Sequence, residues 1–347
     1  MPVPLAVPPL RERAARAAAE PTLWGLGAVV RHRVVHLAAL DGRGRPLRDD
    51  HADLPGGADG LEPVWGTIAD AVTGLTAEAS ESGATVAGVT VVLPGLVDAD
   101  RGLLHDSVAG RAPVAATAQL SRRLGASLPR IRLASHGLLA AVVEVGAGGA
   151  AADGVLCYLS ADDDVDFGLV AHGRPVTGAT GLAGQVGHLP LDPLGHECSC
   201  GRRGCWATVI GLPALLRRAA DPDDPVRDPA LDVDAQVAEI ERRARLDDGR
   251  TRRALAETGH ALGLGVATLS QVLDPDVVVL GGHLGRFLPY LLPAYESARR
   301  HHGVNQCRLE ASHLTETDLV LGAAAAALAL ADPVGQDAEA EARTEGR

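Results

Sequence analysis

The chain has 347 residues, 46% of them hydrophobic, and a formal net charge of −12 at pH 7. Its length and apolar content allow a sizeable core and indicate two domains or one large two-lobed domain. The acidic balance argues against broad contact with nucleic acid or an anionic membrane through this chain alone.

Both ends of the chain are predicted to lie outside the folded core. Residues 1–21 lack the basic segment and apolar stretch of a secretory signal and are typical of a linker or tail. Residues 332–347 are typical of a solvated, disordered acidic tail. No apolar run approaches the roughly 20 residues of a membrane span, so we expect a cytoplasmic protein without membrane contact. A reducing compartment favours metal binding over disulfides for clustered cysteines.

Short β-type runs alternate with Ala- and Leu-rich helical runs between the two tails, which predicts an α/β fold. The strand candidates in chain order are VVHLAAL, VAGVTVVL, RIRLAS, GVLCYLS, GLVAHG and DPDVVVLGG. Residues 251–273 carry apolar side chains at helical spacing and lead into the last of these strands, which ends at Gly281 and Gly282. Such a glycine pair forms either a ligand crevice at the carboxyl end of a sheet or only a tight turn.

The strongest local signal is a cysteine cluster with the spacing C-x-C-G-x-x-G-C. Its predicted metal ligands are His188, Cys198, Cys200 and Cys205. Gly201 and Gly204 let the backbone bend tightly enough to bring the three thiolates to one point. Three sulfurs and one imidazole complete a tetrahedral zinc shell without an open position, so the expected role is structural. The alternatives are idle thiols, a disulfide, or His196 as the fourth ligand.

The segment GLAGQVGHLPLDPLGHECSCGRRGC resembles the zinc signature of the ROK family, which comprises bacterial repressors, open reading frames and sugar kinases. Three further segments resemble family motifs in the same order: VAGVTVVLPGLVDADRG, LDPDVVVLGG and TDLVLGAAAAALAL. The resemblance covers roughly residues 22 to 331. It implies an actin-like ATPase/sugar-kinase (ribonuclease H-like) fold, with two α/β lobes, sugar and ATP between them, and a zinc-binding loop.

This resemblance predicts the division of the chain. We expect a smaller α/β lobe in residues 22–134, to which a C-terminal helix at about 316–331 is added. A larger lobe is expected in residues 135–315, with the zinc loop at 187–206.

Both phosphate loops depart from the family pattern. The first, D-x-G-x-T in the family, aligns with GAVVRHRVVHLAALDG, so Val29 lies near the position of the magnesium-side Asp. The second, G-T-G-I-G in the family, is replaced by a degenerate loop whose acidic residues are Asp162, Asp163, Asp164 and Asp166. Side chains there block the approach of backbone N–H groups to phosphate. A carboxylate about 4 Å from a phosphate charge also costs about 4 kcal/mol at an effective dielectric of 20.

ATP and Mg²⁺ are therefore not expected to bind in the family's usual pose. The four aspartates either hold another divalent cation or form a merely solvated acidic turn.

The catalytic base of the family is also replaced. The family motif N-D-A-N-A-A-A-x-x-E aligns with SHGLLAAVVE, where Glu144 sets the register and Ser135 and His136 replace the Asn-Asp pair. An imidazole can accept a proton from a sugar hydroxyl. The other interpretation of His136 is a partly buried or ligand-facing side chain, and we assign no catalytic residue.

The sugar contacts are fewer than in the family. Gln185 replaces the glutamate of G-E-x-G-H, and Ala207 replaces the glutamate after the last zinc cysteine. The candidate ligand-binding residues are Ser135, His136, Gln185 and His188. Amide and hydroxyl groups both donate and accept hydrogen bonds, so a small neutral ligand such as a sugar remains compatible with this set.

The resulting hypothesis is a zinc-stabilised ROK-type pseudokinase that senses a sugar or metabolite, a module like the family's transcriptional regulators. The resemblance implies a homo-oligomer. Family repressors carry a helix-turn-helix ahead of this fold, and about 21 residues are too few for one, so DNA binding would need a missing upstream domain or a partner. The alternative is an active ATP-dependent hexose kinase with divergent motifs.

Overall fold

The computed structural model describes residues 22–31, 33–54, 60–105, 112–125, 130–147, 153–162, 164–301 and 307–331. The predicted tails and Asp163 lie outside these ranges. The chain forms two compact units. The first consists of Met1–Gly149, Arg174–Ala183 and Leu314–Arg347, and the second of Ala150–Gly173 and Gly184–His313. Within the described ranges, no helix is long and apolar enough to cross a membrane.

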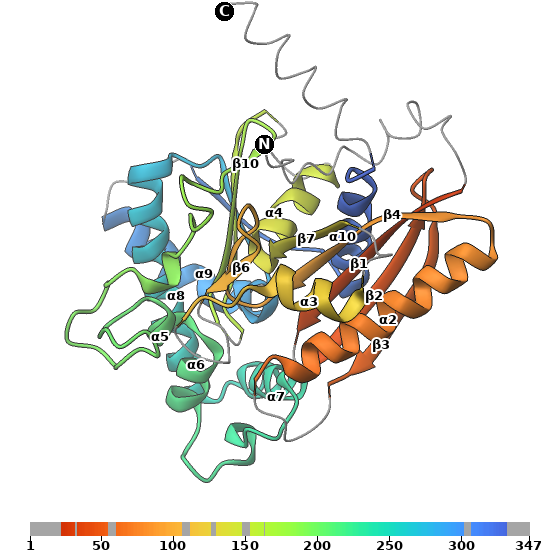
Figure 1. Cartoon of the computed structure of the whole chain (residues 1–347). Coiled ribbons are helices and arrows are strands. Elements are labelled where there is room, and N and C mark those ends of the chain that lie inside the picture. The colour runs from red at the N-terminus through yellow and green to blue at the C-terminus, as the bar shows by residue number, and fades with distance from the viewer. Residues whose placement is uncertain are drawn as a thin grey trace, which may run out of the picture. The chain divides into compact units, whose positions relative to one another are not determined.

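The first unit contains a mixed five-stranded sheet with the order β3-β2-β1-β4-β7 (Figure 1). Its strands are β1 (Leu23–Arg31), β2 (Val34–Asp41), β3 (Pro46–Asp53), β4 (Thr85–Leu93) and β7 (Arg130–Ser135). The pairs β1–β2 and β2–β3 are antiparallel, whereas β4 runs parallel to both β1 and β7. A small antiparallel pair is formed by β5 (Leu96–Asp98) and β6 (Leu103–His105), and the short strand β10 is Arg174–Pro175.

Helices of the first unit pack on both faces of this sheet. They are α2 (Glu62–Glu81), α3 (Ala116–Leu124), α4 (His136–Gly146) and α10 (Glu316–Leu328). Alternate residues of β1 point to opposite faces. Leu26 joins a core with Trp65 of α2 on one face. Gly25 and Gly27 face α10, and a Cβ at either position would clash with backbone oxygens of that helix. The glycines of β1 therefore allow the alanine-rich α10 to approach the sheet closely.

The division between the units differs from the boundary expected at residue 135, because α4 belongs to the first unit. The reason is packing between α4 and α10. A Cβ at Gly322 of α10 would meet Val143 of α4, so the two helices are in close contact. Residues 174–183 likewise belong to the first unit although the surrounding segments belong to the second.

The second unit contains a mixed sheet in which β9, β8, β11 and β12 are adjacent in that order. Its strands are β8 (Val155–Ser160), β9 (Asp166–Ala171), β11 (Val277–Leu280) and β12 (Arg308–Ala311). The β8–β9 pair is antiparallel, and β11 is parallel to β8 and β12. Its α-helices are α5 (Ala207–Ile210), α6 (Leu212–Ala219), α7 (Val233–Arg245), α8 (Gly249–Leu273) and α9 (Gly282–His301), and its 3₁₀ turns are η1 (Val186–His188) and η2 (Pro225–Arg227).

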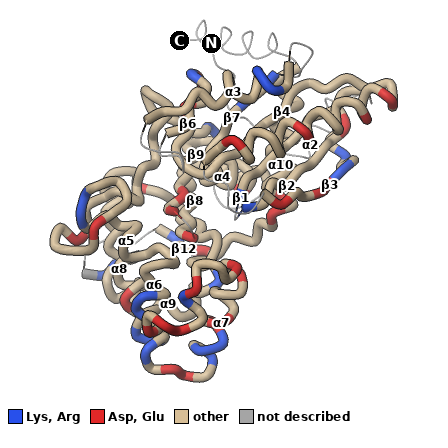
Figure 2. Tube along the Cα trace, turned by 60° about the horizontal axis from the view of Figure 1, so that its bottom comes forward, with Lys and Arg blue, Asp and Glu red and all other residues tan. Residues whose placement is uncertain are grey.

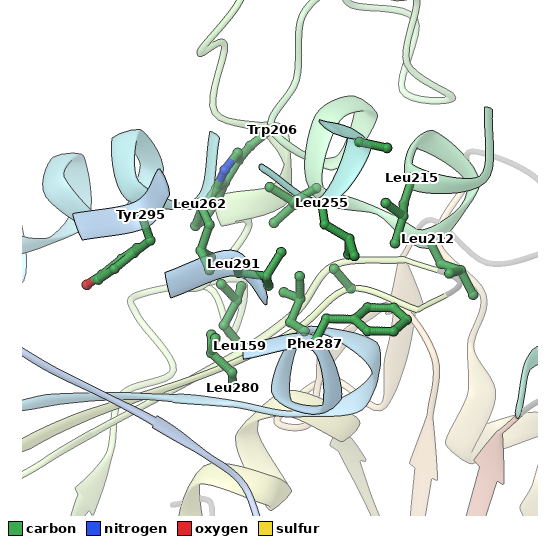
Figure 3. Packing of buried hydrophobic residues seen from close by; sticks show 14 of the residues in the cluster. Leu159, Trp206, Leu212, Leu215, Leu255, Leu262, Leu280, Phe287, Leu291 and Tyr295 are labelled. Carbon is green, nitrogen blue, oxygen red and sulfur yellow. The ribbon is translucent and has the colours of Figure 1, made fainter. Parts of the chain in front are cut away.

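The core of the second unit lies between its sheet and helices α6, α8 and α9. Figure 3 shows Trp206, Leu255, Leu262 and Phe287 converging with strand residues such as Leu280. The predicted helix at 251–273 is confirmed as part of α8, and the strand that follows it is confirmed as β11. The six strand candidates all fall on strands, and the α/β class is confirmed.

Charged residues of both signs gather around α7 (Figure 2). Arg243 lies 2.7 Å from carboxylate oxygens of Asp224 and of Glu239. Glu241 lies 2.7 Å from Arg286 of α9. These pairs connect α7 to the turn before η2 and to α9 within the second unit.

Candidate functional site

The four predicted metal ligands lie together in the second unit. One ligand atom from each of His188, Cys198, Cys200 and Cys205 falls within 4.8 Å of the others. The Cys198 Sγ is 3.7 Å from His188 Nδ1, and the Cys200 and Cys205 sulfurs are 3.6 Å apart. Ligands around a tetrahedral zinc with Zn–S bonds of about 2.3 Å lie about 3.8 Å apart. The cluster therefore has the spacing and the chemistry of a zinc site.

The backbone of the loop brings the cysteines to this point. The N–H of Cys198 donates to the Arg202 carbonyl and that of Gly201 to the Cys198 carbonyl, both at 2.8 Å, which closes a tight turn. Gly201 and Gly204 have φ angles of 81° and 69°. A Cβ at Gly204 would also overlap the backbone of Asp192. The predicted role of both glycines is confirmed, and the cluster of described metal-ligating side chains contains His188 rather than His196.

The thiols of the cluster have opposed pKa shifts. Burial would raise the pKa of Cys200, but hydrogen bonds from the side chain and backbone of Arg202 hold it below its usual value. Burial and the neighbouring thiols raise the pKa of Cys205. Three adjacent thiolates repel one another, and a divalent cation offsets that repulsion.

The acidic loop is split between a buried and an exposed part. Asp162 is 7% exposed, and its Oδ1 accepts hydrogen bonds from the backbone N of His283 at 2.8 Å and faces the Nδ1 of the same residue at 2.9 Å. Asp164 is exposed, and its carboxylate accepts the N–H of Val165. Asp166 belongs to β9, opposite Ser160. Among the described residues, which do not include Asp163, the Cys/His cluster is the only group of three or more side chains placed to hold a metal ion.

Two more loop positions are occupied by packed side chains. Phe167, which follows the acidic loop, lies in the core of the second unit at 8% exposure. Val29 of the first unit is fully buried within β1, opposite Val92 and His36. At neither position is the backbone free of a side chain, as it would be at a glycine.

The candidate ligand-binding residues divide between the units. Ser135 ends β7 and precedes α4, and His136 begins that helix at 3% exposure. The burial of His136 agrees with the buried interpretation. In the second unit Gln185 is exposed immediately before η1, which ends at His188. Thus Ser135 and His136 adjoin each other, as do Gln185 and His188.

The buried contact between His283 and Asp162 was not predicted from the sequence. His283 is 2% exposed, and its Nε2 lies 3.2 Å from the Ile210 carbonyl oxygen. The only local signal was a histidine directly after the glycine pair, at the start of a predicted helix. Its partner lies 121 positions earlier in the chain, a distance that no local pattern spans.

A sequence model of the family described as ROK family matches residues 60–330. The chain belongs to the ROK family. The resemblance drawn from the motifs is thereby confirmed. An N-acetylmannosamine kinase of Yersinia pestis is 27% identical over 169 residues, which are 49% of this chain and 55% of that protein. This ROK-family chain therefore spans about half the length of the curated relatives it matches.

Solved structures show the same ROK fold. A ROK family transcriptional regulator, a homologue of the E. coli MLC protein, has a TM-score of 0.71 at 18% identity, covering 89% of this chain and 78% of its own. A ROK family glucokinase from Streptomyces griseus, in complex with glucose and AMPPNP, has a TM-score of 0.69 at 22% identity, covering 87% and 98%. At these identities the likeness shows the fold alone, which is shared by regulators and sugar kinases.

Proposed function

We propose that this ROK-family chain is a catalytically inactive, sugar-kinase-like protein that senses a sugar or another small metabolite. It acts as a module like the family's transcriptional regulators and does not transfer phosphate. Ser135, His136, Gln185 and His188 are its proposed ligand-binding residues.

The observation that carries this proposal is the filled phosphate loop of the second unit. Asp162 occupies a position where the resemblance places a glycine, and its side chain is buried. Backbone N–H groups bind phosphate only where no side chain covers them. The exposed Asp164 adds negative charge beside any phosphate that approached. Productive binding of a phosphoryl donor is therefore disfavoured both sterically and electrostatically.

The residues at the base and magnesium positions support the same conclusion. Phosphoryl transfer depends on a positioned base and on metal ions that neutralise charge on the transferring group. The chain has the buried His136 at the base position and the buried Val29 near the magnesium-side position. A valine cannot bind a cation.

Zinc is the proposed structural cofactor, bound by His188, Cys198, Cys200 and Cys205. Bound there, it supplies binding free energy to the folded state rather than chemistry. The loop it closes is continuous with Trp206, which is fully buried and whose Nε1 donates to the Ala261 carbonyl at 3.0 Å. Zinc binding therefore couples to the core of the second unit.

A homo-oligomer and a separate DNA-binding domain or partner complete the proposal. Support for a regulatory role comes from the fold shared with a ROK family transcriptional regulator. The cytoplasm is the proposed location, in keeping with a cysteine cluster suited to metal.

The second candidate function is an active hexose kinase, which the kinase relatives favour. A coupled ADP-release assay with glucose, mannose and N-acetylmannosamine at millimolar Mg-ATP distinguishes the two. We expect release at the sugar-free background for every sugar. Sugar-dependent release that disappears in His136→Ala would establish the kinase instead.

Ligand sensing is tested separately by thermal unfolding with the same sugars in the absence of nucleotide. We expect at least one sugar or related metabolite to raise the unfolding temperature of the native protein. Gln185→Ala should weaken that effect, whereas Arg203→Ala, an exposed change in the zinc loop, should not.

A further inference from the structure

The second unit contains a cavity that the proposed function does not use. Its volume is about 520 Å³, and small-ligand sites typically measure about 300–1,000 Å³. The loop before the cysteines and α5 contribute Leu191 and Val209 to its lining, and α8 contributes Ala256, Ala261 and Leu264. All of these residues belong to the same unit, so the cavity forms within it. The mainly apolar lining suits a ligand with an apolar body.

Trp206, which also lines the cavity, is held firmly against α8. Its Nε1 donates to the Ala261 carbonyl at 3.0 Å, and its backbone N–H donates to the Leu189 carbonyl at 2.8 Å. A Cβ at Gly265 would overlap the Trp206 ring, so the ring lies directly on the helix. The lining is thus fixed before any ligand arrives, and a preformed cavity loses little conformational freedom on binding.

The two acidic side chains of the cavity lining have contacts within the protein. The Glu257 carboxylate lies 3.6 Å from the Arg218 side chain, whose positive charge offsets its own. The Asp192 carboxylate packs against Gly195 of its own loop, where an added Cβ would come within 2.6 Å of it. Both carboxylates are therefore engaged by neighbouring groups of the chain.

Arg253 is the cation that remains available at the cavity. In the part of the chain that the structure describes, its guanidinium has no hydrogen-bond or ion-pair partner, and the residue is exposed. His260 lines the same cavity about two turns later on the same face of α8. A guanidinium binds a carboxylate through two parallel N–H···O bonds, and an imidazole N–H can donate another. These two side chains therefore suit a carboxylate at the edge of the apolar cavity.

We propose that this cavity is a second small-molecule site, which binds a carboxylic acid with an apolar body and holds its carboxylate at Arg253. A sugar is a poor occupant, because its hydroxyl groups would lose their hydrogen bonds to water against an apolar lining. The ligand of this site therefore differs in chemical class from the sugar-like ligand proposed for Ser135, His136, Gln185 and His188. Binding here does not depend on whether the chain transfers phosphate.

Three probes of similar size and different charge are titrated calorimetrically into the full chain in the absence of sugar and nucleotide. Phenylacetate is the anionic probe, phenethyl alcohol the neutral one and phenethylamine the cationic one. Arg253→Ala removes the proposed partner of the carboxylate, and Ala256→Trp fills the cavity. The matched control is Arg252→Ala, which removes the same charge at the adjacent position, where the guanidinium instead lies 5.3 Å from the centre of the Tyr290 ring.

We expect phenylacetate to bind the native chain at least about tenfold more tightly than phenethylamine, because only the carboxylate can pair with Arg253. Arg253→Ala should remove most of this preference, whereas Arg252→Ala should keep it. Ala256→Trp should weaken the binding of phenylacetate and of phenethyl alcohol alike.

Equal affinity for the three probes would overturn the inference, as would equal effects of the two arginine variants. Phenylacetate binding that is unchanged in Ala256→Trp would place the probe outside the cavity and refute the site. A native chain without saturable phenylacetate binding would refute it too, including the case in which a second copy of the chain covers the cavity.

Discussion

Gly282→Ala is expected to destabilise the second unit strongly. The added Cβ would overlap the Asp162 carboxylate, and the residue would keep a φ of 55°. The left-handed conformation costs a non-glycine residue about 1–2 kcal/mol. Displacing the carboxylate from the His283 N–H forfeits a hydrogen bond to a charged group, worth about 1.5–3 kcal/mol. We therefore expect a loss of about 2.5–5 kcal/mol in the free energy of unfolding.

Gly249→Ala is the matched control, because it lies in the same unit at the start of α8 and a Cβ there meets nothing within 4 Å. It should be neutral or stabilising by up to about 1 kcal/mol. A chain of two units need not unfold in one step, so the assay is native-state hydrogen exchange of the amides in β8 and β11. Equal exchange free energies in Gly282→Ala and Gly249→Ala would refute the close fit of Gly282 against Asp162.

Three further results are expected. Protein purified without added metal should contain about one zinc per chain. Cys198→Ser should lose the metal and unfold at a markedly lower temperature, whereas Ser199→Ala should not. A fully folded, metal-free sample would contradict the structural role of the metal. Hydrogen bonds from the Arg243 side chain lower the pKa of Asp224 to about 2. The stability that this carboxylate contributes is therefore present above its unfolded-state pKa near 4 and is lost as pH falls towards 2. The acid-unfolding curve of Asp224→Asn should lack this loss of stability, and a curve identical to that of the native protein would refute the contribution. His136→Asp should leave sugar phosphorylation at background, since a general base supplies only about 10²- to 10⁴-fold and needs a positioned phosphoryl group; clear turnover by this variant would contradict the account.

Features encoded by neighbouring residues were predictable from the sequence. The spacing of the cysteines and the two glycines between them predicted the zinc loop, and both its ligands and its positive φ angles follow that prediction. The apolar periodicity of residues 251–273 predicted α8. Ordered motifs predicted the family, which the match to residues 60–330 confirmed.

Features that depend on distant segments were not predictable. The acidic loop was expected to keep phosphate away by the bulk and charge of its side chains, but the sequence did not show that Asp162 is buried and paired with a residue 121 positions away. The boundary expected at residue 135 differs from the structural division at α4, because α4 packs against α10, a helix about 180 residues later in the chain. The need for glycine in β1 was not predictable for the same reason, because α10, the helix that packs against these glycines, lies about 300 residues later.

We propose that this ROK-family chain keeps the sugar-kinase fold without binding the phosphoryl donor. Calorimetric titration of the native protein with Mg-ATP, with and without a saturating hexose, measures that binding. No saturable heat of binding is expected up to millimolar nucleotide. A saturable isotherm with a micromolar dissociation constant would contradict it and return the chain to the active kinases.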